Sequence, residues 1–151
     1  MEAWIGIGSN VGDSRTLCSE AIARLRNLFP VQFAVSSLYR TAPVGKGFDG
    51  DFINAVCRIY TDKEPYELLA TLQMVEYGLG KEVKVRGRGN RMMDLDLLLY
   101  GDLILQEETL QIPHPGWWDR LFVLIPMHEV APWLLWRGEQ ICLNKRIAEL
   151  N

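Results

Sequence analysis

Two acidic side chains, Asp94 and Asp96, are separated by one residue in the otherwise apolar stretch 92–100. Leu and Tyr dominate this stretch, and a Gly101 turn signal follows it, so the pattern predicts a strand that runs through a core. Side chains alternate between the two faces of a strand. Both carboxylates are therefore expected on one face, about 6.6 Å apart along the chain.

A divalent cation is the expected partner of this acidic pair. No basic residue stands within the stretch, and two unpaired anions on an apolar strand carry a large desolvation cost. Oxygen ligands with no nearby Cys or His pair favour Mg²⁺ or Mn²⁺ over zinc. The alternative is that the pair lies at the frayed end of an edge strand, with both acids in water.

A basic cluster precedes the acidic pair. Residues 81–91 hold five basic residues and one acidic residue, a local charge of +4. Because the whole chain has a net charge of −3, the remaining residues together carry −7. The basic members are Lys81, Lys84, Arg86, Arg88 and Arg91. One concentrated cluster suits a small polyanion such as a nucleotide polyphosphate better than an extended nucleic acid. An ordinary solvated loop is the alternative.

Length and composition predict one domain over residues 1–151. The chain has 151 residues and 48% hydrophobic composition, which is enough for one core. Its first residues lack the basic region of a signal peptide, and the apolar run 121–127 is too short to cross a bilayer. Three scattered cysteines show no CxxC spacing, which fits a reducing cytoplasm.

Strand and helix patterns alternate along the first hundred residues. Strand-like runs are expected at 3–7, 31–39, 53–61 and 91–100, and helices at 14–29 and 65–79. The glycines in and after the first strand, Gly6, Gly8 and Gly12, fit neither a dinucleotide fingerprint nor a P-loop. The element order βαββαβ predicts an α+β fold, a ferredoxin-like sandwich with an antiparallel sheet and two helices on one face.

The last fifty residues are expected to be an elaboration of this core. They predict a hairpin near Leu103-Ile104, a Pro-His-Pro turn, and helices around 122–130 and 144–150. Between the second and third strands, the stretch 40–51 is rich in glycine and too long for a tight turn. Such stretches are typical of lids and binding loops.

Five short motifs in sequence order resemble 6-hydroxymethyl-7,8-dihydropterin pyrophosphokinase, a family of folate-pathway enzymes. They are Gly8-Ser9-Asn10, Tyr39–Gly45, Asp51–Ala55, Arg91 ahead of Asp94-Leu95-Asp96, and Pro113-His114 followed by Arg120-x-Phe122. The resemblance runs from about residue 4 to residue 132. It implies transfer of a pyrophosphoryl group from ATP to the hydroxymethyl oxygen of the reduced pterin, with release of AMP.

The resemblance also implies roles for individual residues. Asp94 and Asp96 match the family's two Mg²⁺ ligands, for two ions that act together with ATP. The pterin site is implied to contain Thr41, Ala42, Pro43, Val44, Phe52, Asn54 and Phe122. Contacts to ATP are implied for Glu76, Lys81, Lys84, Arg86, Arg88, Arg91, His114 and Arg120. The catalytic group is implied to be Asp94, Asp96, Arg91, Arg120 and His114.

Structural alternatives stand beside several of these roles. By residue type alone, His114 between two prolines could be a turn histidine, and Asn54 could simply close a turn. Arg120 could pair with Asp119 or Glu129 on the surface. The chain also departs from the family pattern at Phe52, Lys81, Asn90 and Met92-Met93, and these departures bear on loop preorganisation and ATP affinity.

Three classes of function follow from the sequence. The first is an active ATP-dependent pyrophosphokinase, and the second is a homologue that binds pterin or nucleotide with impaired catalysis. The third is a ferredoxin-like nucleic-acid module, which the acidic balance outside one loop disfavours. We expect ATP and a reduced pterin as partners, no nucleic acid and no membrane, and a monomer, with a weak homodimer as the alternative.

Overall fold

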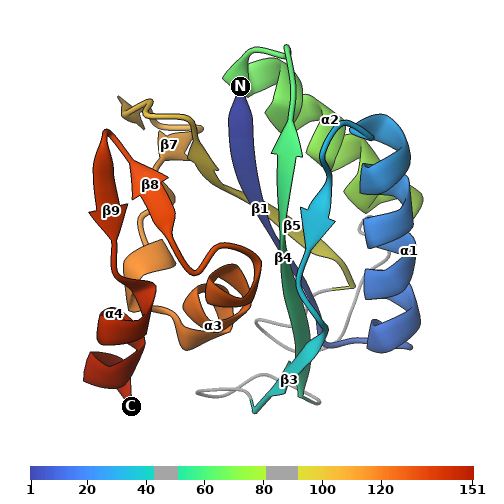
Figure 1. Cartoon of the computed structure of the whole chain (residues 1–151). Coiled ribbons are helices and arrows are strands. Elements are labelled where there is room, and N and C mark those ends of the chain that lie inside the picture. Colours follow the sequence, from blue (N-terminus) through green and yellow to red (C-terminus); the bar gives the residue numbers. More distant parts are fainter. Residues whose placement is uncertain (43–50, 81–91) are drawn as a thin grey trace.

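A five-stranded antiparallel sheet forms the centre of the computed structural model, which describes residues 1–42, 51–80 and 92–151. Its strands are β1 (Glu2–Ser9), β2 (Ala34–Val35), β3 (Tyr39–Thr41), β4 (Phe52–Tyr60) and β5 (Asp94–Tyr100). Their order is β2-β4-β1-β5, and β3 pairs with β4 next to β2. The longest strands, β1 and β4, are therefore central, and β5 forms one edge (Figure 1).

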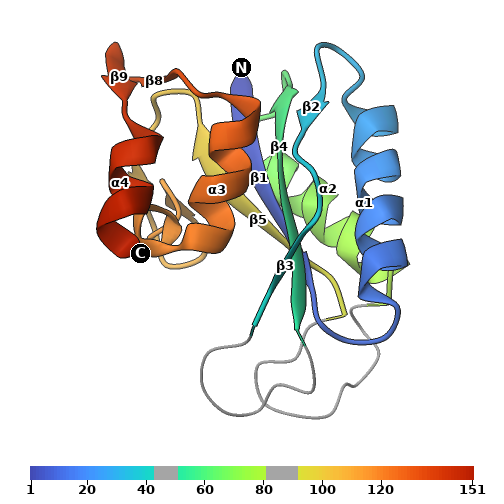
Figure 2. The same cartoon turned by 60° about the horizontal axis from the view of Figure 1, so that its bottom comes forward.

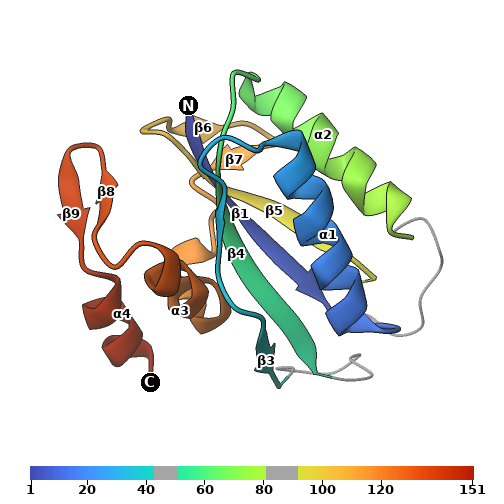
Figure 3. The same ribbon diagram turned by 45° about the vertical axis from the view of Figure 1, so that its right-hand side comes forward.

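Two helices, α1 (Ser14–Leu28) and α2 (Pro65–Gly78), cover one face of this sheet (Figure 3). Asp13 caps α1 because its carboxylate accepts hydrogen bonds from Thr16 N at 3.2 Å and Thr16 Oγ1 at 2.8 Å. Pro65 occupies the first turn of α2, where its missing N–H costs nothing. Both helices were expected from the sequence, and both are confirmed within one residue at each end.

The first core lies between these helices and the sheet. Leu25 of α1, Leu72 of α2 and Ile5 of β1 are fully buried there, together with Leu95 and Leu97 of β5. The alternation expected for β5 is confirmed, because Leu95 and Leu97 face the helices while Asp94 and Asp96 line a cleft on the other side.

Residues 117–150 pack on the opposite face of the sheet (Figure 2). They contain the short helix η1 (Trp117–Asp119) and the helices α3 (Leu121–Val130) and α4 (Leu143–Leu150). A second core forms there, in which Leu124 and Met127 of α3 bury against Trp4, Val56 and Leu98 of the sheet. The elaboration expected from the sequence is therefore a layer of the fold rather than an appended tail.

The strand expected over 31–39 is interrupted. Only Ala34–Val35 and Tyr39–Thr41 are strands. Between them, Ser36 still bonds to Val56 of β4, but the hydroxyl of Ser36 donates to Ser37 O at 2.8 Å, and the N–H of Ser37 points to a side chain of α3. Local side-chain bonds of this kind compete with a strand ladder, and the sequence expectation of a continuous strand was wrong for this reason.

Two hairpins occur in the C-terminal part. The first pairs β6 (Leu105–Gln106) with β7 (Gln111–Ile112), slightly later than the expected position at 103–104. The second pairs β8 (Leu134–Trp136) with β9 (Glu139–Ile141) and was not expected. Its two-residue turn places Arg137 and Gly138 at φ 52° and 78°, the left-handed geometry that favours glycine in such turns.

No helix in the described ranges is both long and apolar enough to span a membrane.

The second core generates a stability prediction. Leu124→Ala removes a fully buried side chain under α3 and should lower the free energy of unfolding by about 2–5 kcal/mol. Leu135→Ala is the matched control, because Leu135 lies in β8 of the same layer but is 66% exposed, and it should change stability by less than about 0.5 kcal/mol. Urea denaturation measures both. Equal small losses would mean that the C-terminal layer is not part of the cooperative fold.

Candidate functional site

A row of three residues crosses the sheet at one end of its central strands. In the antiparallel register, Gly8 of β1 is the direct neighbour of Asn54 on β4 and of Asp94 on β5. Gly6 is likewise the neighbour of Asp96. Because glycine has no side chain, the sheet surface between the amide and the two carboxylates stays open. A Cβ at Gly8 would come within 3.1 Å of Asn54 Oδ1.

A cleft of about 680 Å³ lies over this row. The sheet forms its floor, and the start of α3 forms the facing wall. Its lining is Gly6, Ile7, Gly8, Thr41, Ala42, Phe52, Asn54, Ala55, Asp94, Asp96, Asp119, Arg120, Leu121, Phe122, Val123 and Leu150. The structure therefore brings together residues that are more than a hundred positions apart in the sequence.

The glycines of the cleft floor were not recognised as site residues from the sequence. Their spacing fits neither a dinucleotide fingerprint nor a P-loop, and although Gly8 belongs to one of the five motifs that resemble the family, no site role was assigned to it. The sequence did contain a signal for their role. Gly6 and Gly8 are separated by one residue on one strand, so they must lie on the same face of the sheet and leave that face open. That face is the one that carries Asp94 and Asp96 across the pairing with β5.

The carboxylates of Asp94 and Asp96 open into this cleft and are half-buried. The alternative that both acids lie in open water at a frayed strand end does not fit this position, although β5 is an edge strand as that alternative assumed. Within the described residues, no group of three or more His, Cys, Asp or Glu side chains is arranged to hold a metal ion. A pair of carboxylates suits Mg²⁺, which usually takes its other ligands from phosphate and water.

Polar and aromatic groups occupy the β4 end of the cleft. Asn54 is 5% exposed, and its side-chain Nδ2 donates to Thr41 Oγ1 at 2.8 Å. This leaves the amide oxygen of Asn54 facing Gly8. The rings of Phe52 and Phe122 both line the cleft, one from β4 and one from α3. A cleft that contains an amide edge and two aromatic rings can bind a flat heterocycle with its own donors and acceptors.

His114 and Arg120 approach the Asp94 end from the segment before α3. The Nδ1 of His114 accepts from Gly116 N at 3.1 Å, so the neutral ring carries its proton on Nε2. Burial lowers the pKa of His114 and the positive charge of Arg120 lowers it further, while Asp94 acts in the opposite direction. His114 is therefore a neutral hydrogen-bond donor at pH 7.

Gly116 makes room for Arg120. A Cβ at Gly116 would lie 2.6 Å from Arg120 Nε and 2.9 Å from Nη2, so the guanidinium rests against the glycine. The guanidinium also lies over the Phe122 ring, 5.6 Å from its centroid. The two surface partners considered from the sequence are engaged elsewhere: Asp119 pairs with Arg146, and Glu129 binds Ser37 and Tyr39.

Glu76 of α2 is only 3% exposed and lies on the other side of β5. Its Oε2 accepts a hydrogen bond of 2.7 Å from the backbone N–H of Leu95, the residue between the two aspartates. A charged acceptor on a backbone N–H makes a strong bond. Glu76 therefore anchors the acidic strand at this point.

Seven candidate residues fall outside the described part of the chain. They are Pro43, Val44, Lys81, Lys84, Arg86, Arg88 and Arg91. The other candidates fall into two groups. Thr41, Ala42, Phe52, Asn54, Asp94, Asp96, Arg120 and Phe122 line the cleft directly. His114 lies beside the cleft, where it interacts electrostatically with the lining residues Arg120 and Asp94. Glu76 supports the strand that carries the aspartates.

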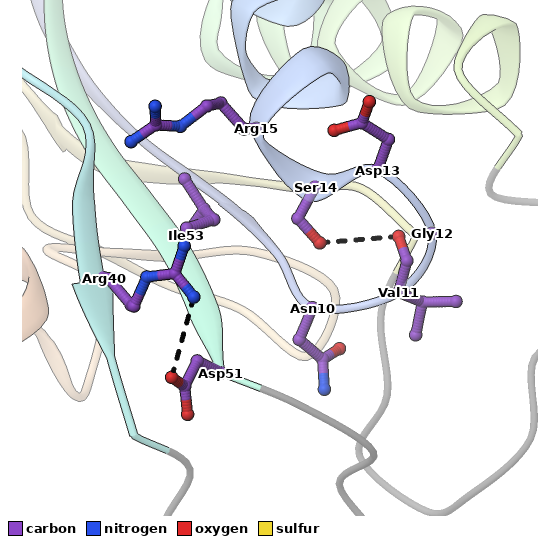
Figure 4. A pocket seen from close by; sticks show the side chains of 9 residues that line it. All are labelled: Asn10, Val11, Gly12, Asp13, Ser14, Arg15, Arg40, Asp51 and Ile53. Atoms are coloured by element: carbon purple, nitrogen blue, oxygen red, sulfur yellow. Dashed lines mark hydrogen bonds and ion pairs between the residues drawn. The ribbon is translucent and has the colours of Figure 1, made fainter.

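A second hollow of about 470 Å³ lies at the turn between β1 and α1 (Figure 4). It contains both charge signs, since Arg15 and Arg40 share it with Asp13 and Asp51. Arg40 faces Asp51 at 3.9 Å in a solvent-exposed pair, which contributes little stability. The cleft over the glycine row is the better candidate because aligned carboxylates, an amide and aromatic rings converge there.

Comparison with known proteins points to one family. The family model for 7,8-dihydro-6-hydroxymethylpterin-pyrophosphokinase (HPPK) matches residues 4–132. The chain is 41% identical over 130 residues to the 2-amino-4-hydroxy-6-hydroxymethyldihydropteridine pyrophosphokinase of Bacillus subtilis, covering 85% of this chain and 77% of that protein. It is 39% identical over 142 residues to the protein of the same name from Haemophilus influenzae, covering 92% and 87%.

Solved structures of longer proteins share the fold. The crystal structure of Plasmodium falciparum HPPK-DHPS wild type with pteroate matches with a TM-score of 0.70 at 12% identity, covering 98% of this chain and 42% of that chain. The HPPK-DHPS in complex with substrates matches with a TM-score of 0.68 at 12% identity, covering 98% and 44%. This chain therefore spans less than half the length of these two proteins, and the likeness concerns the fold alone.

The position of His114 generates a pH prediction. In an NMR titration, His114 should lose its proton with a midpoint below its ordinary value of 6.5, and Arg120→Gln should raise that midpoint. A lowered pKa in the folded state means that the unfolded chain binds the proton more readily. The stabilisation of the folded protein by neutral His114 is therefore fully present above pH 6.5, and the free energy of unfolding declines as the pH falls below that value.

His128→Gln, which leaves a single histidine in the chain, assigns the His114 signal. A midpoint at or above 6.5 would contradict the described burial of His114 beside Arg120.

Proposed function

This chain belongs to the 7,8-dihydro-6-hydroxymethylpterin-pyrophosphokinase family, and from this we propose that it transfers the pyrophosphoryl group of ATP to 6-hydroxymethyl-7,8-dihydropterin in folate biosynthesis. The products are the pterin diphosphate and AMP. The observation that carries the proposal is the row of Asn54, Gly8 and Asp94 on the floor of one cleft, with Arg120 and Phe122 on the wall.

The β4 end of the cleft is the proposed pterin site. Asn54 is held by Thr41, so its amide is oriented before the ligand arrives, and its oxygen can accept from the pteridine edge. Phe52 and Phe122 supply apolar faces on either side. Ala42, with Pro43 and Val44 beyond it, completes the proposed site. This places the hydroxymethyl group toward Asp94 along the glycine row.

The β5 end is the proposed ATP site. Asp94 and Asp96 are the proposed ligands of two Mg²⁺ ions, which would offset the charge of the triphosphate. Arg120 provides a bidentate donor for phosphate oxygens, and His114 offers its Nε2–H. The remaining proposed ATP contacts are Lys81, Lys84, Arg86, Arg88 and Arg91. Glu76, which the resemblance also implied as an ATP contact, is instead proposed to support the strand that carries the two aspartates.

In the proposed reaction, the hydroxymethyl oxygen forms a bond to the β-phosphorus of ATP. The bond between that phosphorus and the oxygen that bridges to the α-phosphate breaks, AMP leaves, and the hydroxyl proton is lost to solvent. The residues of this chain contribute by orienting the pterin and by placing positive charge on the phosphates, and positioning of this kind accounts for most catalysis of phosphoryl transfer.

The finer description of the fold is also a proposal. We propose that residues 1–151 form one domain with a ferredoxin-like βαββαβ arrangement. The strand order β2-β4-β1-β5, the antiparallel pairings and the position of α1 and α2 on one face support it. The two buried clusters share one sheet, which supports a single unit.

The oligomeric state, the absence of nucleic-acid binding and the cellular compartment are also proposals. We propose a monomer that binds no nucleic acid, because the described residues of one chain supply the floor and the wall of the cleft, and the net charge is −3. Cys18, Cys57 and Cys142 are all free thiols, which supports a reducing compartment, and we propose the cytoplasm.

The acidic pair generates the first functional prediction. Asp94→Asn and Asp96→Asn keep the side-chain size but remove the negative charge, so each should lower the rate of AMP formation by about a hundredfold or more. Pterin binding should change little, because its proposed contacts lie around Asn54. The rate is measured by AMP release with ATP, Mg²⁺ and the reduced pterin. Asp102→Asn, in the turn after β5, is the control.

Near-normal AMP release from the double variant of Asp94 and Asp96 would contradict the proposed metal ligands. A wild-type protein that binds both substrates without releasing AMP would instead identify a homologue with impaired catalysis.

Asn54 generates a second functional prediction. Asn54→Ala removes the oriented amide and should weaken pterin binding by about 2–3 kcal/mol, because a site built for a polar edge loses that bond. Binding of a non-hydrolysable ATP analogue with Mg²⁺ should stay within about twofold. Isothermal calorimetry measures both. The reverse pattern would show that Asn54 only supports the turn at the start of β4.

A further inference from the structure

A single carboxylate joins the end of α3 to the segment between β2 and β3. Glu129 lies in the last turn of α3, and both of its oxygens accept from Ser37 N, at 3.1 and 2.9 Å. The Ser37 hydroxyl donates to Oε2 at 3.1 Å, and the Tyr39 hydroxyl donates to Oε1. We call Glu129, Ser37 and Tyr39 the Glu129 clamp. It spans about ninety residues of sequence.

The position of this acid is unfavourable by the rules of helix stability. A negative charge in the last turn of a helix opposes the helix dipole. Partial desolvation raises the pKa of Glu129, but the hydrogen bonds from Tyr39 and Ser37 outweigh it and leave that pKa lowered. The same contact raises the pKa of Tyr39 to about 12. The carboxylate is thus stabilised as an anion by the segment that it contacts.

Both ends of the clamp lead directly to the cleft. From Glu129, α3 runs back two turns to Phe122, which lines the cleft wall. From Tyr39, β3 runs two residues on to Thr41, which binds the side chain of Asn54. Pro126 removes one backbone hydrogen bond in this part of α3, but the buried side chains of Leu124 and Met127 hold the helix against the sheet. A bond between the far ends of α3 and β3 therefore limits how far Phe122 can move from Thr41 and Asn54.

We propose that Glu129 is a positioning residue that sets the width of the pterin end of the cleft, between Phe122 on one side and Thr41 and Asn54 on the other. It touches no substrate. This inference rests on the proposed function only for the identity of the ligand; the mechanical link between α3 and β3 is independent of it.

The test compares ligand affinities of Glu129→Ala with those of the wild type. Pterin affinity should fall between about tenfold and a hundredfold, since small displacements of binding groups have effects of this size. Affinity for a non-hydrolysable ATP analogue with Mg²⁺ should stay within about twofold, because the Asp94 end does not depend on this contact. In steady state, KM for the pterin should rise more than kcat falls.

Glu107→Ala is the matched control. Glu107 accepts a hydrogen bond from the Tyr66 hydroxyl, so it forms a second exposed Glu–Tyr pair between distant segments, but it joins α2 to the β6–β7 connection away from the cleft. Its loss should leave pterin affinity within about twofold. If Glu129→Ala lowers pterin affinity no more than Glu107→Ala, or lowers nucleotide affinity equally, the proposal is overturned.

Two milder variants separate positioning from general destabilisation. Glu129→Gln retains acceptor oxygen for Ser37 and Tyr39 and should keep most of the pterin affinity. Tyr39→Phe removes one donor and should weaken pterin binding in the wild type, but have little further effect in Glu129→Ala, because the two residues act through one contact. Additive effects of the two substitutions would contradict a shared clamp.

A readout without ligand distinguishes failure of this proposal from failure of the proposed function. In amide NMR spectra of the ligand-free protein, Glu129→Ala should shift the Asn54 side-chain signal and the backbone signals of Thr41 and Phe122, and Glu107→Ala should not. If the wild type binds no pterin, the proposed function fails while these shifts still support the clamp. Unchanged signals in Glu129→Ala would overturn the clamp whatever the ligand.

Discussion

The pairing of β1 with both β4 and β5 is the constraint on which the rest of the structure depends. Each strand contributes a different part of the site: β4 carries the amide, β1 the glycines and β5 the two carboxylates. Antiparallel hydrogen bonding fixes which residues become neighbours, and a slip by one position would turn every one of these groups to the opposite face. The open row across Gly8 exists only in this register.

One face of the sheet is closed by packing, and the other is partly open and carries the cleft. The face that carries Leu95 and Leu97 is closed by α1 and α2, where Glu76 also bonds to the backbone of β5. The other face is covered by α3 at one part and left open over the glycines at another. Burial on the first face and beneath α3 holds the sheet rigid, so the open part can present polar groups in a preformed arrangement.

Family membership and geometry support the function at different levels. The matches to pyrophosphokinases establish the family, while the cleft provides a physical reason for the proposed division into a pterin end and an ATP end. At the proposed ATP end, His114 accepts a hydrogen bond from the backbone N–H of Gly116, and Arg120 rests against the same glycine. Both side chains are therefore positioned by one backbone turn.

Local patterns in the sequence were sufficient for the elements and for the acidic pair. The helices α1 and α2 follow from apolar spacing and capping residues, and the shared face of Asp94 and Asp96 follows from the two-residue period of a strand. The motifs that resemble the family included Thr41, Asn54, Asp94, Asp96 and Arg120 of the cleft, but not Asp119. These features depend on neighbours within a few positions, and a single sequence contains that information.

Tertiary structure alone decided which of these groups meet. The role of Gly6 and Gly8, the break at Ser36–Ser37 and the Glu129 clamp all depend on partners far away in the chain. A side chain such as Glu129 looks like an ordinary exposed acid in the sequence. Its partners come from a segment ninety residues away, and only the packing of α3 against the sheet brings them within hydrogen-bonding distance.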